Sequence, residues 1–436
     1  MRKLIVCFAI ILLIAAPSYA EVKEYRLPNG LNVLMIEDHK APLAVFQIWY
    51  RVGSRNEPAG KTGLSHLLEH MMFKGTPKYG SKAFSNLVQK YGGTDNAYTT
   101  KDYTMYYQRL PSGKIDLSIE LEADRMKNLL MDEKETLAER DVVMEERRLR
   151  YEDDPQTSLY EEVMAAAFKV YPYRWPVIGW MSDLKGIGRD DLYDYYKKYY
   201  SPDNAVIVVS GDINPDELIK KIEAGFSGIK PSPVPRPEIT SEEPPQKGQR
   251  RVYLKREAEL PYMLAVYHAP AFPDEDAYSL EVLAMVLSGG KSGRVYKSLI
   301  YEKKIAISAF ADYSGLTSGP ALFYLGGTAS PGRDIGEVER AFHEEIDKIK
   351  AGPPSGIEVQ KARNQIEASF LMSQDSIYFQ AQLTGMYEMA GGWRLKDSYL
   401  QGIRKVTPED IQRVARKYLI EDAGTVGILM PVKENK

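Results

Sequence analysis

Two histidines and a glutamate occur together in the stretch Gly63-Leu64-Ser65-His66-Leu67-Leu68-Glu69-His70-Met71-Met72-Phe73. On a helix, residues four apart lie one turn apart on the same face, so His66 and His70 can direct both imidazoles at one point. Glu69 borders that face. Two neutral imidazoles beside a carboxylate suit a catalytic zinc site, and H-x-x-E-H is the inverse of the H-E-x-x-H zinc motif. The stretch therefore predicts a metal site on a helix.

The alternative is a pair of histidines on an ordinary amphipathic helix. The chain has only five histidines, and two of them stand four apart with a glutamate between them. The other positions of the helix are apolar nearly all round, which predicts that it is buried. Histidine and glutamate side chains on a buried helix need polar partners or a cation. The pattern therefore favours the metal site. The apolar residues are Leu64, Leu67, Leu68, Met71 and Met72.

A catalytic zinc ion usually has three protein ligands and one open position, so a third ligand is needed. Glu69 is better suited to be the general base. The acidic helix at 139–146 offers other carboxylates, because Glu139, Val142, Val143 and Glu146 share one face at helical spacing. Acidic and apolar residues together on a core face would require a cation.

A solvated run of charges is the competing interpretation of this acidic helix. It accounts well for Glu145, Arg147 and Arg148, and less well for Glu139 and Glu146. The spacing alone leaves both interpretations open for the helix as a whole.

The order of patterns predicts two domains joined by a proline-rich segment. A hairpin is expected at 25–36, strands at 44–52, 99–109 and 206–210, and helices at 62–73, 114–130 and 134–151. Six prolines then fall between residues 230 and 245, which predicts an extended linker. We therefore expect an N-terminal zinc-binding domain at 21–229, a linker at 230–249 and a C-terminal domain without a zinc site at 250–436.

The two expected domains resemble each other near their ends. A helix beginning near Asp191 and a strand beginning near Ala205 are matched by a helix near Asp410 and a strand near Gly424. Both pairs are separated by 219 residues. Two unrelated amphipathic helices could match by chance, but the shared order of helix and apolar strand favours an internal duplication.

The first twenty residues have the pattern of a secretory signal. Arg2 and Lys3 precede an apolar run at 4–16 and a small-residue site that predicts cleavage after Ala20. A transmembrane anchor is the alternative, but the run is short for a span, and no later stretch is apolar enough to anchor the chain. Cys7, the only cysteine, lies inside this segment. Removal of Arg2 and Lys3 changes the net charge from -3 to -5. These features predict an exported protein of the bacterial periplasm.

The balanced charge and the length of 436 residues limit the classes of function. A nucleic-acid-binding protein would normally show a strongly basic stripe, which this chain lacks. A chain of this length is expected to form more than one domain. No nucleic-acid partner is therefore expected.

The chain resembles the half-length pitrilysin or insulinase-type zinc peptidases, which include the mitochondrial processing peptidase subunits and many bacterial zinc peptidases. The resemblance covers essentially the whole mature chain. Its motifs are Arg26-Leu27-Pro28-Asn29-Gly30-Leu31, Gly53-Ser54-Arg55-Asn56-Glu57, the run from His66 to Thr76, Gly92-Gly93-Thr94-Asp95-Asn96-Ala97-Tyr98-Thr99, and the acidic helix from Glu139 to Glu146.

This resemblance implies an α+β fold of two homologous domains, each a mostly antiparallel sheet flanked by helices, together forming half of a clamshell. It implies one Zn²⁺ per chain, held by His66, His70 and Glu146. Glu69 would be the general base for the attacking water, and Glu139 a catalytic-site carboxylate that supports the ligands.

The resemblance also implies a peptide substrate held as an extended strand. Asn96, Ala97 and Tyr98 correspond to the edge strand of the family that pairs with the substrate by strand addition. The expected activity is therefore that of a zinc-dependent endopeptidase acting on peptides or unfolded segments.

One departure from the family concerns the C-terminal half. The family has an Arg and a Tyr seven residues apart that help to bind substrate, and Ile300 and Ile307 stand at those positions here. In two-subunit members one chain supplies zinc and the other supplies the Arg/Tyr pair. We therefore expect a heterodimer with a related zinc-less subunit, with a homodimer as the other arrangement. A non-catalytic scaffold or a peptide-binding clamp of the same fold is the alternative function.

Overall fold

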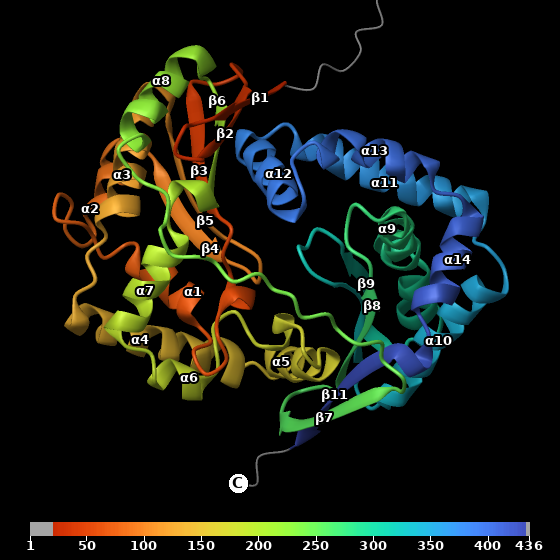
Figure 1. Cartoon of the computed structure of the whole chain (residues 1–436). Coiled ribbons are helices and arrows are strands. Elements are labelled where there is room, and N and C mark those ends of the chain that lie inside the picture. Colours follow the sequence, from red (N-terminus) through yellow and green to blue (C-terminus); the bar gives the residue numbers. More distant parts are fainter. Residues whose placement is uncertain (1–20, 433–436) are drawn as a thin grey trace, which may run out of the picture.

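The computed structural model describes residues 21–432, and the predicted signal segment at 1–20 lies outside the described residues. Two lobes face each other across the molecule (Figure 1). The N-terminal lobe is built on strands β1–β6 and the C-terminal lobe on strands β7–β11. In the described part of the chain, no helix is both long and apolar enough to span a membrane.

The N-terminal lobe contains a six-stranded sheet in the order β1-β2-β6-β3-β5-β4. All neighbouring strands are antiparallel except β2 and β6, which are parallel. Strand β6 is buried along its whole length, as the apolar run at its residues 205–209 predicts. The strands are β1 (Val22–Arg26), β2 (Asn32–Glu37), β3 (Leu43–Tyr50), β4 (Thr94–Thr99), β5 (Thr104–Pro111) and β6 (Ala205–Gly211).

One face of this sheet packs against helices of the same lobe. Leu67, Ile119, Tyr195 and Ile222, from four of these helices, join a single buried cluster with inward residues of the sheet such as Phe46. The helices of this half are α1 (Leu64–Met71), α2 (Ala83–Lys90), α3 (Ile115–Asn128), α4 (Glu133–Arg147), α5 (Pro155–Ala167), α6 (Met181–Lys185), α7 (Arg189–Tyr199) and α8 (Pro215–Phe226).

The C-terminal sheet repeats the topology of the N-terminal sheet. Its order is β7-β11-β8-β10-β9, which is the order β2-β6-β3-β5-β4 with each strand replaced by its later counterpart. The one parallel pair, β7 with β11, also matches. The strands are β7 (Arg250–Glu257), β8 (Tyr262–Ala269), β9 (Ala306–Ser314), β10 (Ala321–Ala329) and β11 (Gly424–Val432).

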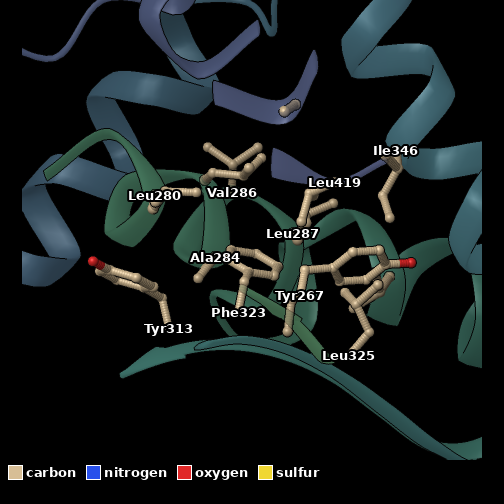
Figure 2. Packing of buried hydrophobic residues seen from close by; sticks show 14 of the residues in the cluster. Tyr267, Leu280, Ala284, Val286, Leu287, Tyr313, Phe323, Leu325, Ile346 and Leu419 are labelled. Carbon is tan, nitrogen blue, oxygen red and sulfur yellow. The ribbon is translucent and has the colours of Figure 1, made fainter. Parts of the chain in front are cut away.

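The helices of the C-terminal half follow the same plan. Figure 2 shows how residues of the sheet, including Tyr267 and Phe323, meet Leu280 and Leu287 of α9 in the core of this lobe. Helices α7 and α14 begin 219 residues apart, as do β6 and β11, which matches the predicted repeat. The helices are α9 (Glu275–Ser288), α10 (Ile335–Ala351), α11 (Gly356–Ser373), α12 (Ile377–Ala390), α13 (Leu395–Lys405) and α14 (Pro408–Tyr418). The predicted fold class is therefore confirmed.

Each half covers the remaining sheet face of the other half with one helix. Helix α12 packs on the N-terminal sheet, where Ala381 and Met389 contact a cluster that contains Trp49. Helix α5 packs on the C-terminal sheet, where Leu159 and Val163 contact the cluster of strands β8 and β11. Both helices lie between the lobes in Figure 1. No pattern in the sequence indicates this exchange of helices.

The boundaries of several predicted elements were wrong. The strand expected at 99–109 is in fact two strands, β4 and β5, joined by a turn at 100–103. The helix expected at 134–151 ends as an α-helix at Arg147 and continues as a wider π-helical turn at Arg148–Glu152. Between α8 and β7, the described proline-rich segment contains neither helix nor strand.

Candidate metal centre

Helix α1 begins at a tightly constrained turn. Gly63 has φ = 97°, and a Cβ there would lie 2.7 Å from the carbonyl oxygen of Ile178, so only glycine fits. The buried Glu57 carboxylate accepts hydrogen bonds from the backbone N–H groups of Gly63 at 2.8 Å and Ser65 at 2.7 Å. Burial raises the pKa of Glu57 to about 8, although these two amides favour its charged form. These contacts fix where the histidine helix starts.

Three predicted ligands converge at one point. The Nε2 atoms of His66 and His70 lie 3.9 and 3.4 Å from the same oxygen of Glu146 on helix α4. One ligand atom from each of the three residues can be chosen so that all lie within 4.8 Å of one another. The histidine rings meet edge to face with centroids 4.7 Å apart. Residues 76 to 80 positions apart in the sequence are therefore gathered around one small volume.

Glu139 contacts the ring nitrogen of His70 that faces away from Glu146. One of its oxygens lies 2.8 Å from Nδ1 of His70, and the other pairs with the ammonium group of Lys74. The hydrogen bond to His70 lowers the pKa of Glu139, so the carboxylate is charged at neutral pH. A carboxylate at Nδ1 fixes the tautomer that leaves Nε2 free to bind a metal.

The electrostatic environments of the two histidines differ. Burial, and then the neighbouring His70, lowers the pKa of His66 to about 4, which keeps its imidazole neutral. Burial alone would also lower the pKa of His70, but hydrogen bonds to Glu139 and Glu146 outweigh it and raise the value to about 9. Without a metal, the second imidazole therefore carries the charge that balances the carboxylates.

Glu69 lies next to the cluster and faces strand β4. The Thr99 hydroxyl donates a hydrogen bond of 2.5 Å to its carboxylate. Burial raises the pKa of Glu69, and the bond from Thr99 opposes this only in part. A raised pKa suits a carboxylate that must accept a proton and then release it.

A cavity of about 940 Å³ opens directly over these side chains. The predicted substrate-binding residues Asn96, Ala97 and Tyr98 line it together with His66, Glu69, His70 and Glu146. Strand β4 is the last strand of its sheet, so the edge turned away from β5 has no strand partner among residues 21–432. The cavity and the free edge are large enough to receive an extended peptide segment.

The donor set fits a zinc ion. A tetrahedral ion with bonds of about 2.0–2.1 Å separates its ligand atoms by roughly 3.3 Å, close to the spacings seen between the imidazoles and Glu146. Catalytic zinc sites often use two imidazoles and one carboxylate as ligands, which leaves the fourth position on the metal open. Glu146 also lies 2.9 Å from the guanidinium of Arg150, which contacts the carboxylate oxygen that does not face the histidines.

Comparison with known proteins shows the family to which both lobes are similar. Residues 32–179 match the model of the family described as "Insulinase (Peptidase family M16)", and residues 186–366 match "Peptidase M16 inactive domain". The zinc protease PqqE of Helicobacter pylori is 30% identical over 422 residues, which cover 95% of this chain and 94% of that protein.

The chain belongs to peptidase family M16.

Two further proteins show how far the similarity to M16 members extends. A protein named "Probable mitochondrial-processing peptidase subunit beta, mitochondrial" from Arabidopsis thaliana is 25% identical over 426 residues. The matched region covers 96% of this chain and 80% of that protein. The crystal structure of a protease from Helicobacter pylori matches with a TM-score of 0.91 at 29% identity and covers 94% of this chain and all of that one. Both lobes of the M16 fold are therefore present.

The two isoleucines that depart from the family pattern in the sequence analysis lie in the C-terminal half of this M16 chain. Ile300 packs partly against the core of the C-terminal lobe, whereas Ile307, at the start of strand β9, is 55% exposed. Neither side chain can donate a hydrogen bond or carry charge.

Two details of the predicted acidic helix were wrong. Val142 was expected on the inward face, but it is 51% exposed, because the buried face of α4 is formed by Thr136, Glu139, Val143 and Arg147. The charge-run interpretation would leave Arg147 solvated, but it is buried and makes two hydrogen bonds of 2.8 Å to Glu161 of α5. Glu145 is exposed, as expected, and pairs with Arg148.

Sequence reasoning missed two residues that support the site. Glu57 was seen only as part of a family motif, and its place before the apolar helix could have indicated a cap for the free amides of α1. Thr99 had no distinguishing signal, because its contact with Glu69 depends on how β4 packs on α1.

Proposed function

We propose that this M16 family member is a zinc-dependent endopeptidase. The observation that carries the proposal is the convergence of His66 Nε2, His70 Nε2 and a Glu146 oxygen at the floor of an open cavity. Such a half-buried group of imidazoles and carboxylates is costly to maintain without a cation to compensate it.

His66, His70 and Glu146 would hold one zinc ion. When bound, the ion would supply Lewis-acid activation of the scissile carbonyl and of the attacking water. Glu69 accepts the proton of that water and delivers it to the leaving amine, a role that its raised pKa and its position beside the ligands support. Glu139 orients the His70 ring through Nδ1.

The proposed substrate is a peptide or unfolded segment in extended conformation. It adds to the free edge of β4 beside Asn96, Ala97 and Tyr98, so that main-chain hydrogen bonds hold it across the metal ligands. Binding through the main chain is tolerant of sequence and leaves selectivity to side-chain pockets.

We further propose that the working enzyme contains a second subunit. Ile300 and Ile307 cannot stabilise negative charge on the substrate, so an Arg/Tyr-bearing, zinc-less relative would supply those groups in a heterodimer. The relative from Arabidopsis thaliana is itself named as a subunit. The basic and apolar pattern of the first twenty residues supports export, and we propose the periplasm as the location.

Metal analysis of the purified chain tests the central proposal. We expect about one zinc per chain, retained in Glu69→Gln and lost in His66→Ala and Glu146→Ala. Glu69→Gln should reduce proteolysis by at least about a hundredfold, because general-base catalysis typically contributes that much. Glu145→Gln, an exposed neighbour on the same helix, is the matched control and should change neither property.

Two results would contradict parts of the proposal. A wild-type chain that binds no zinc would remove the catalytic assignment altogether. Robust zinc-dependent cleavage by the chain alone would leave the assignment standing but remove the need for a second subunit.

The alternative is a scaffold or peptide-binding subunit without activity. The apolar residues at positions 300 and 307 favour it, as does the match of residues 186–366 to a domain described as inactive. It predicts peptide binding that is unchanged by Glu69→Gln and no cleavage by the chain, with or without its zinc-less relative.

A further inference from the structure

A second cavity of about 420 Å³ lies where the two lobes meet. The hairpin turn after β4 forms one wall, helix α5 a second, and the loop between β9 and β10 a third. Its lining is mostly apolar or aromatic. The residues that matter for the argument are Thr99, Lys101, Tyr160, Tyr173, Val177 and Tyr324.

Lys101 places its amino group in this cavity without a carboxylate partner in the described part of the chain. Its ammonium group donates to the backbone oxygen of Tyr173, and no carboxylate in the described chain lies within 4.0 Å of it. The neighbouring Asp102 is already engaged by Arg55 at 3.1 Å, by the Tyr173 hydroxyl at 2.5 Å and by the backbone N–H of Ser318 at 3.2 Å. An ammonium group has three N–H donors, so Lys101 retains donors for a ligand.

Burial and the lack of a close carboxylate leave the Lys101 ammonium group poorly stabilised within the described residues. Burial lowers the pKa of Lys101 to about 7, and the charge of Asp102 only partly opposes this. Among the described residues that line the cavity, Lys101 is the only base and Asp102 the only acid. The side chain stays partly exposed even though it is enclosed by protein on most sides.

The cavity adjoins the metal centre. Thr99 and Val177 line both cavities, and the Thr99 hydroxyl bonds to Glu69. Lys101 follows Thr99 by two residues, which span no more than about 7 Å of extended chain. A peptide lying along β4 would therefore have side chains within a few residues of its scissile bond close to this ammonium group.

We propose that this cavity is a specificity subsite in which Lys101 binds a carboxylate of the peptide substrate. The proposal rests on the proposed peptidase function and deepens it, because it names a class of substrate: peptides with an acidic side chain, or a free C-terminus, a few residues from the cleaved bond. A single ammonium group among apolar and aromatic walls suits one carboxylate on a short stem. A phosphate or another polyanion would need several cationic donors.

A labelling experiment tests carboxylate binding without relying on proteolysis. The zinc-loaded full chain is acetylated with trace acetic anhydride near neutral pH, and the labelling of Lys101 is measured by mass spectrometry against the exposed Lys127. Saturating Ac-Ala-Glu-Ala-NH2 should slow the labelling of Lys101 about fivefold at pH 7, because raising its pKa from about 7 by one unit lowers the fraction of free amine from about a half to about a tenth. Ac-Ala-Gln-Ala-NH2 should have no effect. Ac-Ala-Ala-Ala with a free C-terminus tests the other source of the carboxylate.

A cleavage experiment tests selectivity. A peptide library digested by the wild-type protein should show enrichment of Asp and Glu, or of chain ends, at one position near the cut. Lys101→Met should lower the preference for Glu over matched Gln peptides at least about tenfold, Lys101→Arg should largely keep it, and Lys127→Met should not alter it. A merely structural role would change overall rates and stability but not this ratio.

The two experiments separate the two proposals. Protection of Lys101 by an acidic peptide in a protein that cuts nothing would sustain the carboxylate site and reject the peptidase. Equal labelling with the acidic, neutral and free-acid peptides would overturn the inference, whether or not the protein cleaves. An unchanged Glu-to-Gln ratio in Lys101→Met would overturn it as a specificity subsite.

Discussion

The two carboxylate oxygens of Glu139 have different partners. One lies beside Nδ1 of His70 in helix α1, and the other pairs with Lys74 in the segment after that helix. The His66 ring has no equivalent support, since its Nδ1 atom is buried without a hydrogen-bond partner in the described residues. One imidazole is therefore oriented by a charged hydrogen bond and the other by packing.

This asymmetry predicts the effect of Glu139→Gln. Loss of the charged acceptor should weaken zinc binding by about 10–100-fold, the range typical of carboxylates that orient a metal-bound histidine. The measurement is competition for zinc with a chelating dye. Asp141→Asn, an exposed carboxylate on the same helix, serves as the control. Equal affinities for Glu139→Gln and the control would refute the supporting role.

Asp276 shows a different use of charge, far from the metal centre. It is nearly buried at the start of α9, and its carboxylate accepts from Arg413, from Lys417 at 2.8 Å and from the Tyr418 hydroxyl at 2.7 Å. Burial opposes ionisation, but these partners outweigh it and lower the pKa of Asp276 to about 2. The group joins helices α9 and α14 of the C-terminal lobe.

The lowered pKa predicts how stability depends on pH. Because the folded pKa lies below the unfolded value, the contribution is complete above about pH 4 and is lost as the pH falls toward 2. After allowance for solvent screening, it amounts to about 1–2 kcal/mol. Thermal unfolding between pH 2 and 6 should show a shallower acid decline for Asp276→Asn. Asp190→Asn, an exposed aspartate, should follow the wild type.

At the scale of elements, helix α12 meets the N-terminal sheet at a very close approach. A Cβ at Gly385 would lie 2.2 Å from the indole of Trp49, which is itself fully buried. Arg51 also reaches across to the carboxylate of Glu388 on α12 at 2.6 Å. Glycine at this position therefore sets the distance between the helix and the sheet.

Gly385→Ala should consequently destabilise the protein. Overpacking against a rigid indole costs roughly 1–3 kcal/mol, which exceeds the gain of up to about 1 kcal/mol from the better helix propensity of alanine. Denaturant unfolding measures the difference. Gly356→Ala, at a helical glycine with open space around its Cβ position, should be neutral or stabilising. A Gly385→Ala protein as stable as the wild type would rule out the close contact.

Elements with a strong local pattern were predictable from the sequence, and those defined by distant contacts were not. The H-x-x-E-H spacing and the apolar run of β6 depend on residues close together in the chain, and the repeat at 219 residues compares two such local patterns. The turn between β4 and β5 was missed because Tyr103 and Thr104 continue the strand-like composition. The burial of Arg147 depends on Glu161, whose position is set by the packing of α5.

At the scale of the whole molecule, the two lobes depend on each other. Helix α5 belongs to the N-terminal half of the sequence but covers the C-terminal sheet, and α12 does the reverse. The segment between the lobes is also tied down, because Glu243 accepts three backbone hydrogen bonds from residues 169–171. Helix α5 also lines the cavity of Lys101 and bonds to helix α4, which carries the metal ligand Glu146.

Separated halves should therefore be unstable. A fragment of residues 21–229 would expose the sheet face around Trp49, and a fragment of residues 250–436 would expose the face that α5 covers. We expect each fragment to aggregate when expressed alone and the two to form a soluble complex when expressed together. Light scattering and size-exclusion chromatography measure both states. A monomeric, cooperatively folding single fragment would contradict the interdependence.

The exchange of helices α5 and α12 between the two halves also bears on the origin of the chain. A protein made of a single repeat would have had a bare sheet face and a helix with nowhere to pack within its own copy. Two such copies could satisfy each other by swapping that helix about a twofold axis. Gene fusion would then have joined the swapped pair, and one copy could lose its histidines while its helix went on supporting the copy that kept them.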